Sequence, residues 1–418
     1  MEQKTSYKLP IAIMFALFFM IAFVTGLPSP MGVIVAKQFG ASAFESQLGF
    51  FANFIAYAFM GIPAGLMLKR IGYKKTAMTA VTVGFVGVGV QFLSGVAGSF
   101  AVYLAGAFIC GFSVCMLNTV VNPMLNTLGG GGNKGNQLLL FGGASNSIGA
   151  TIVPFLVGYL MGAEAGRTIE KANPALFIAM AIFAVAFAVL AFSKIPEPHM
   201  EKRADKAATP DKYGPMSFRH FILGTIAIFI YVGVEIGLPS TANLYMTQQL
   251  GIDAAVAGSI VGLYWLLMLC GRLVGGSIGA KVSSRTMMIF VSTAGLAMLA
   301  AAILLPASAA VTLPTSLGGV KVPVSIVLIV LCGLCTSVMW GGIFNLAVEG
   351  LGKYTAAASG IFMVMVCGGG IIPALQGWVA DMTDYVASYW VIFACLAYLL
   401  YYATLGCKNV NKDIPVEE

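Results

Sequence analysis

Long apolar runs separated by short polar turns dominate this chain. Each run holds about 20 or more residues, which is enough for a helix to cross the hydrocarbon core of a membrane. Six precede residue 194 and six follow residue 219, near 10–38, 45–68, 74–94, 98–128, 134–163, 173–194, 219–250, 253–280, 285–306, 321–351, 354–380 and 384–406. The pattern predicts an all-α integral membrane protein with 12 transmembrane helices. We expect two six-helix halves, at residues 1–194 and 219–418, joined by a polar linker at 195–218.

The composition supports a membrane protein and excludes several classes of soluble protein. The chain has 418 residues, of which 59% are hydrophobic and only 9% are charged, whereas soluble domains are about one-quarter charged. A soluble enzyme, a secreted disulfide scaffold and a receptor with a large ectodomain are therefore excluded. All eight cysteines fall in or at the end of apolar runs, so we expect buried small side chains, with no metal and no cofactor.

The basic residues predict the orientation of the chain. Most of the 23 Lys and Arg residues fall in turns on one side, while the other side holds only Lys37, Arg167, Lys171 and Lys321. Basic loops stay in the cytoplasm, so both termini and the linker should be cytoplasmic. We expect a multi-pass protein of the plasma membrane, in a bacterium the inner membrane. The charge then reflects contact with the lipid bilayer, and neither nucleic acid nor an obligate protein partner is expected.

The two halves repeat one another in sequence. The run GLPS at 26–29 recurs at 237–240, and Gly61 and Gly65 before one basic turn match Gly271 and Gly275 before another. Two pseudo-symmetric six-helix halves are the architecture of the major facilitator superfamily, in which the substrate binds near the midplane between the halves. Pro28 and Pro239 lie inside spans one and seven, where helix breaks are tolerated if they line a cavity. Simple packing kinks are equally compatible with these prolines.

Further sequence motifs resemble one family within this superfamily. The turn at 65–75 reads GLMLKRIGYKK and is similar to the superfamily signature G-x-x-x-D-R-x-G-R-R, with Lys69 in place of Asp and Arg70 and Gly72 in register. Together with NSIG at 146–149 and YVGVE at 231–235, it resembles the fucose/glucose/galactose–proton symporter family, closest to the glucose/galactose branch. The resemblance implies import of a neutral sugar, an aldohexose such as glucose or galactose, with a proton by alternating access.

Departures from that family concern the N-terminal half. Where its fucose transporters carry an Asp in span one and a Glu in span four, this chain has Ser29 and Asn118. Residues 138–143 have also lost the polar side chains of the family pattern. Fucose is therefore in question as a substrate, and an amino sugar or a disaccharide remains open.

One acidic residue stands out at membrane depth. Glu235 follows Arg219 by sixteen residues, which places it roughly 24 Å along the helix. An ionised carboxylate there is costly unless it is protonated, paired or bound to an ion. We predict that Glu235 is the proton-coupling residue. A sodium site, with nearby oxygens completing the shell, and a satisfied structural carboxylate are the alternatives.

A neutral sugar needs amide and hydroxyl partners together with aromatic faces. Unpaired amides are not tolerated in lipid, so the amides of the predicted spans are candidate substrate contacts: Asn53, Asn118, Asn122, Asn146, Asn243 and Asn345. The candidate aromatic platforms are Tyr264, Trp265 and Trp340, although aromatic residues in helices more often serve packing. Asn122 precedes Pro123 and could instead satisfy a broken backbone. Lys69, Arg70, Gly72 and Arg272 are expected to be gate and anchor elements of the cytoplasmic side.

Other functions on the same fold would leave different signs. A multidrug efflux antiporter would favour an apolar, aromatic pocket over six asparagines. A membrane enzyme would need paired catalytic groups at depth, and only Glu235 is there. A nucleotide-driven pump is excluded, because the chain has no phosphate-binding loop ending in Lys-Ser or Lys-Thr.

Overall fold

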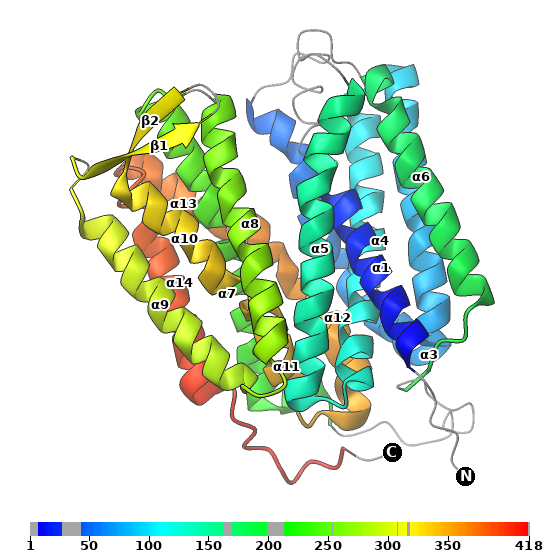
Figure 1. Ribbon diagram of the computed structural model, residues 1–418. Coiled ribbons are helices and arrows are strands. Elements are labelled where there is room, and N and C mark those ends of the chain that lie inside the picture. Colours follow the sequence, from blue (N-terminus) through cyan, green and yellow to red (C-terminus); the bar gives the residue numbers. More distant parts are fainter. Residues whose placement is uncertain are drawn as a thin grey trace.

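The computed structural model describes residues 7–26, 43–161, 169–198, 213–252, 254–306, 308–315 and 318–416. Pro28, expected to break the first span, lies outside these residues. The described part is a bundle of long helices (Figure 1). The helices are α1 (Lys8–Gly26), α3 (Ala43–Ala97), α4 (Phe100–Leu128), α5 (Gly132–Met161), α6 (Ile169–Phe192), α7 (Arg219–Leu244), α8 (Ala254–Ile278), α9 (Ser284–Leu304), α10 (Val324–Thr336), α11 (Met339–Val348), α12 (Thr355–Val364), α13 (Gly368–Met382) and α14 (Tyr389–Tyr401).

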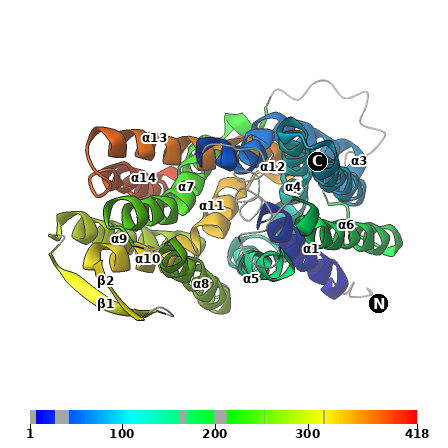
Figure 2. The same cartoon turned by 90° about the horizontal axis from the view of Figure 1, so that it is seen from above.

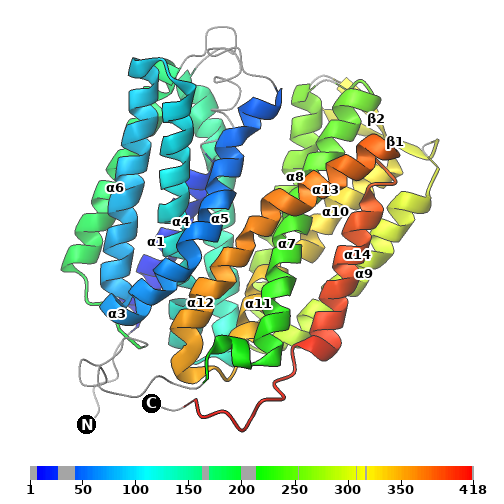
Figure 3. The same ribbon diagram turned by 180° about the vertical axis from the view of Figure 1, so that it is seen from behind.

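Helix α3 contains two membrane spans. Its 55 residues would measure about 80 Å if straight, more than twice the roughly 30 Å hydrocarbon core. The helix breaks at Gly72, where φ is 83° and ψ is 177°, a conformation that favours glycine. The chain therefore turns back at Gly72, and the two limbs of α3 meet at this turn and diverge from it (Figure 3).

The length and apolar character of the helices fit the expected membrane protein. Ten stretches of described helix are long and apolar enough to cross a membrane. One of them, residues 51–97, includes both limbs of α3, and the 30-residue α5 is not among the ten. Separating the limbs of α3 and including α5 is in line with the twelve predicted crossings.

A short β-hairpin accompanies the helices of the bundle. Between α9 and α10, β1 (Ala310–Thr315) and β2 (Gly318–Pro323) form an antiparallel hairpin, with Ala310 opposite Pro323 and Thr312 opposite Lys321. The sequence around Lys321 alternates small, β-branched and polar residues, which suits a short exposed hairpin. Because apolar periodicity identifies only the spans, it gave no sign of this connection.

The helices form two groups (Figures 1 and 2). The N-terminal group is α1 and α3–α6, and the C-terminal group is α7–α14. The principal contacts between the groups are those of α3 with α12 and of α5 with α8. Both contacts lie toward the end that carries the α3 turn, the start of α5 and the turn between α8 and α9. We call it the basic end, after Lys69, Lys75, Lys134 and Lys281 in those segments.

Small residues allow close approach of the two groups at the basic end. Gly61 and Gly65 of α3 lie directly against the backbone of Gly360 in α12, so that a Cβ on Gly360 would come within 2.6 Å of the Gly61 carbonyl oxygen. At the same end, the Asn126 side chain of α4 donates to Asn345 Oδ1 of α11 over 2.6 Å. The two groups are therefore held together at this end by backbone packing and by a buried amide pair.

Candidate functional site

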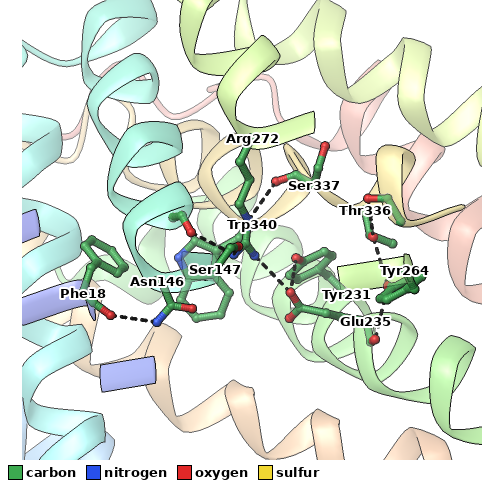
Figure 4. A network of polar contacts seen from close by, with 12 residues as sticks. Phe18, Asn146, Ser147, Tyr231, Glu235, Tyr264, Arg272, Thr336, Ser337 and Trp340 are labelled. Atoms are coloured by element: carbon green, nitrogen blue, oxygen red, sulfur yellow. Dashed lines mark hydrogen bonds and ion pairs between the residues drawn. The ribbon is translucent and has the colours of Figure 1, made fainter. Parts of the chain in front are cut away.

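A carboxylate and a guanidinium form the centre of a polar network between the two helix groups (Figure 4). Glu235 Oε1 of α7 accepts from Tyr231 Oη over 2.9 Å and from Arg272 Nη2 of α8 over 3.1 Å. The Arg272 and Glu235 side chains are only 10% and 14% exposed. Ion pairing and hydrogen bonds of this kind offset the cost of burying each charge. Of the states expected for Glu235, the structure has the paired one.

Arg272 extends the network into the N-terminal group. Its Nη1 donates to Ser147 Oγ over 2.6 Å and to the Gly143 carbonyl over 3.0 Å, both on α5. Its Nε donates to the Ser337 carbonyl, 3.4 Å away, between α10 and α11. We expected Arg272 to be a gate or anchor element of the cytoplasmic side and not a ligand. The side chain reaches Glu235 and joins α7, α8 and α5, and its role as a gate element stays a prediction.

The proline in α7 has a direct effect on this centre. Pro239 has no N–H, so the carbonyl four residues earlier, that of Glu235, loses its helical donor. Tyr264 Oη of α8 supplies a replacement at 3.2 Å and also contacts Thr336 Oγ1 of α10 at 3.0 Å. Tyr264 is fully buried and so packs within the C-terminal group as a partner for the broken helix.

Trp340 makes a second connection between the helix groups. Its Nε1 donates to Asn122 Oδ1 of α4 over 2.9 Å, and its ring packs edge-on against Tyr231, with centroids 6.4 Å apart. Asn122 Nδ2 donates in turn to the Asn118 carbonyl over 2.8 Å. Asn122 is therefore not the residue that repairs the break at Pro123.

The carbonyl that Pro123 frees in α4 is that of Thr119, four residues earlier. Ser359 Oγ of α12 donates to this carbonyl over 3.1 Å. A hydroxyl from the C-terminal group thus satisfies a helix break in the N-terminal group.

The other predicted amides are distributed along the molecule. Asn118 Nδ2 donates to Tyr57 Oη over 2.8 Å, Asn53 Nδ2 to the Gly49 carbonyl over 3.4 Å, and Asn146 Nδ2 to the Phe18 carbonyl over 3.0 Å. These three bonds stay within the N-terminal group.

Asn345, Asn243 and Trp265 do not join the central network through any of the contacts described. Asn345 pairs with Asn126 and with Ser284 Oγ at the basic end. Asn243 Oδ1 is buried on α7 with no hydrogen-bond partner among the described residues. Trp265 packs edge-on against Tyr264, with centroids 5.2 Å apart.

The turn of α3 is fastened to the end of α6. The Glu197 carboxylate accepts from the backbone N–H groups of Tyr73 and Lys74, directly after Gly72. Lys74 Nζ donates to the carbonyls of Ala191 and Ser193, over 2.8 and 2.9 Å. Burial raises the pKa of Glu197, although these N–H donors oppose the shift. In the same turn Lys69 is half-buried and Arg70 is exposed; their role as gate and anchor residues stays a prediction.

Comparison with known proteins gives the family. The sequence description of the Major Facilitator Superfamily matches residues 13–374. The chain belongs to this superfamily. A glucose/galactose transporter of Brucella abortus is 28% identical over 98% of this chain and 96% of its own length. The L-fucose-proton symporter of Escherichia coli is 23% identical over 98% of this chain and 96% of its own.

The fold of this superfamily member also matches solved structures. A crystal structure of the E. coli fucose:proton symporter FucP aligns with a TM-score of 0.78 at 20% identity, over 95% of this chain and 98% of that one. The resemblance to the fucose/glucose/galactose–proton symporter family agrees with these relatives, all of which are transporters.

The sequence analysis did not identify several residues that belong to the polar network of this superfamily member. Tyr231 lies one helical turn before Glu235, a spacing that brings side chains together, and Ser147 directly follows the candidate Asn146. Asn126, Thr336 and Ser359 gave no local pattern. Among the described residues, no cluster of three or more His, Cys, Asp or Glu side chains is placed to hold a metal ion. The absence of a metal or cofactor stays a prediction.

Proposed function

We propose that this protein is a secondary active transporter that imports a neutral sugar, an aldohexose such as glucose or galactose, together with a proton. The observation that carries the proposal is the Glu235 centre. One carboxylate, ion-paired with Arg272, lies in a network whose other described members are neutral amides, hydroxyls and aromatic rings. The relatives named as glucose/galactose transporter and L-fucose-proton symporter support both the substrate class and the proton.

In this proposal the carboxylate carries the proton and the neutral groups bind the sugar. Ionised Glu235 is stabilised by Arg272 and Tyr231, and protonation removes the charge that they stabilise. Sugar hydroxyls can exchange bonds with amides of the kind that Asn118 and Asn122 present, and an indole such as Trp340 offers an apolar face. Burial away from water strengthens each of these interactions.

Alternating access then requires the two helix groups to move relative to each other. We propose residues 1–194 and 219–418 as the moving halves, with the segment 195–218 as their connection. The basic end would face the cytoplasm together with both termini, following the positive-inside rule, in the inner membrane of a bacterium. Since the helix groups are packed together at the basic end, this state would expose the site only from the opposite side.

Uptake into proteoliposomes tests the proposal. Radiolabelled galactose or glucose is offered under an imposed pH gradient, inside alkaline, with and without sodium. We expect accumulation that a protonophore abolishes and that needs no sodium. Accumulation that depends on sodium alone would overturn the choice of ion. The assignment of an aldohexose as the substrate would be overturned if hexoses were not taken up under either gradient, while an amino sugar or disaccharide was taken up or apolar cations were exported.

The residue-level prediction concerns Glu235→Gln. The amide keeps an oxygen that Arg272 and Tyr231 can reach, but it cannot carry a proton. We expect uphill accumulation to fall to the equilibrium level while sugar counterflow continues. Glu349→Gln is the matched control, because this glutamate is exposed at the end of α11 and lies outside the network. Concentrative uptake by Glu235→Gln would show that the proton binds elsewhere.

A further inference from the structure

Asparagines recur on one face of α4, which leads from the central network to the basic end. Asn118, Asn122 and Asn126 follow one another at intervals of four residues, so their side chains lie one above the other along the helix. Trp340 of α11 bonds to this row at Asn122. Asn345, five residues further along α11, bonds to the row at Asn126. The row of amides therefore continues beyond the central network toward the basic end.

The amides at the basic end belong to a neutral group of side chains between the two helix groups. Asn126 Nδ2 donates to Asn345 Oδ1 over 2.6 Å, and Asn345 Nδ2 donates to Ser284 Oγ of α9 over 2.8 Å. All three residues are buried. No charged side chain takes part in the described bonds of these residues. Their chemistry therefore suits the hydroxyl groups of an uncharged polar molecule.

Asn136 of α5 adds an amide whose hydrogen-bonding capacity is unused. Neither its Oδ1 nor its Nδ2 has a partner among the described residues, although the residue is only 1% exposed. A Cβ added to Gly341 of α11 would lie 3.2 Å from Asn136 Oδ1, and a Cβ added to Gly135 would lie 2.9 Å from Asn126 Nδ2. A buried amide without a partner is costly, so packing in the closed state does not account for an asparagine here. We call Asn126, Asn136, Asn345 and Ser284 the inner amide cluster.

Resting on the proposed function, we propose that the inner amide cluster is a second binding subsite for the neutral sugar, which the sugar occupies as it leaves through the basic end. In the closed state three members satisfy one another and Asn136 has no described partner. Opening of the basic end separates α4 and α5 from α9 and α11, which breaks these bonds and leaves the amides to bind sugar hydroxyls. Since Asn126 follows Asn122 by four residues, the sugar then lies about 6 Å nearer the cytoplasm than in the central network.

Transport measured from each side of the membrane tests this subsite. Radiolabelled galactose enters inverted vesicles from the basic end and right-side-out vesicles from the opposite end. Asn136→Leu removes the unused donor and acceptor, and loss of one or two hydrogen bonds to a ligand weakens binding about fivefold or more. We expect the half-saturating galactose concentration to rise by at least about this factor from the basic end and to change less than about twofold from the opposite end.

Asn173→Leu is the matched control. Asn173 Oδ1 is also buried without a partner among the described residues, but this asparagine lies on α6, whose principal contacts are with α3 of its own helix group. The control should change neither half-saturating concentration. Should Asn136→Leu fail to fold, Asn136→Ala removes the same amide with a smaller side chain and should give the same one-sided rise.

Thermal unfolding without sugar separates a binding role of Asn136 from a structural one. Asn136→Leu replaces an amide that has no described partner, so we expect the Tm to stay the same or to rise. Asn345→Leu leaves Asn126 and Ser284 without the partner that each now has, so we expect its Tm to fall. A fall in Asn136→Leu as large as that in Asn345→Leu would show that Asn136 bonds within the fold, and it would overturn the inference.

The transport outcomes distinguish the inner subsite from the proposed function. An unchanged value from the basic end, or equal rises from both ends, overturns the subsite even if galactose is imported with protons. The one-sided rise supports the subsite even if sodium drives uptake. If the unmodified protein carries glucosamine or lactose and not galactose, a one-sided rise with that sugar supports the subsite and its absence overturns it. Vesicles that carry none of these sugars from either end overturn both proposals.

Discussion

Closure of the basic end depends on a contact that a single methyl group should disrupt. A Cβ added to Gly360 would lie 2.6 Å from the Gly61 carbonyl oxygen, 2.8 Å from Gly65 Cα and 3.0 Å from Gly65 N. These atoms belong to the backbone and cannot rotate away. Ordinary carbon contacts need about 3.5–4.0 Å, so α3 and α12 would have to separate by about 1 Å. Overpacking of this kind costs about 1–3 kcal/mol.

That cost falls mainly on the closed state, because the two glycine faces meet only when the helix groups are packed together. A penalty of about 1–3 kcal/mol corresponds to a population shift of roughly 5–150-fold. Gly360→Ala should therefore open the basic end. A cysteine at Gln137 reports the opening, since the Gln137 side chain bonds to the Gly276 carbonyl across the two groups at this end.

The assay measures labelling of Gln137→Cys by a membrane-impermeant maleimide in inverted vesicles, in a parent that carries Cys270→Ala because Cys270 is exposed. Labelling should be at least fivefold faster when Gly360→Ala is added. Gly262→Ala is the control, because a Cβ there meets no atom within 4 Å. Equal labelling rates in the parent and in Gly360→Ala, with unchanged thermal stability, would refute the view that this contact holds the gate closed.

Two further predictions concern stability and are measured by thermal unfolding in detergent. Tyr264→Phe should cost about 1–3 kcal/mol by leaving the Glu235 carbonyl without a donor; adding Pro239→Ala supplies the missing N–H and should recover part of the loss, whereas an equal loss in the double variant would contradict the assignment. Burial raises the pKa of Glu197 above its ordinary 4.5, so the folded state binds this proton more tightly than the unfolded state. The free energy of unfolding therefore falls as the pH rises from about 4.5 to the higher pKa of the folded state. Glu197→Gln should remove that slope, and a slope that persists belongs to another group.

The sequence predicts the architecture well because the bilayer imposes strong constraints. A spanning helix must be apolar over its whole length, so the runs, the repeat and the basic turns reveal the spans. The same constraint makes Glu235 conspicuous, since an acid at that depth needs a partner. Arg272 was predicted only as a gate or anchor element, and its pairing with Glu235 was not deduced. That pairing depends on how α7 and α8 pack, which the sequence does not state.

Burial predicts that each candidate asparagine has a hydrogen-bond partner, but it does not predict which partner. All six candidate asparagines lie in spans, and each must find a partner, but a backbone carbonyl serves as well as a substrate. Asn53 and Asn146 bond to carbonyls of their own helix group, whereas Asn345 bonds to Asn126, 219 positions earlier in the chain. Local sequence cannot distinguish these cases, because the face of a helix that meets another group is decided by tertiary packing.

The two broken helices differ in a way that bears on the transport cycle. In α7 the carbonyl freed by Pro239 is satisfied by Tyr264, within the C-terminal group, so this bond can persist while the groups move. In α4 the carbonyl of Thr119 depends on Ser359 of the opposite group. Separation of the groups would remove its donor, and an unpaired carbonyl at membrane depth is costly. In the proposed transport cycle this carbonyl then needs a new donor, from water, from another side chain or from a hydroxyl of the transported molecule.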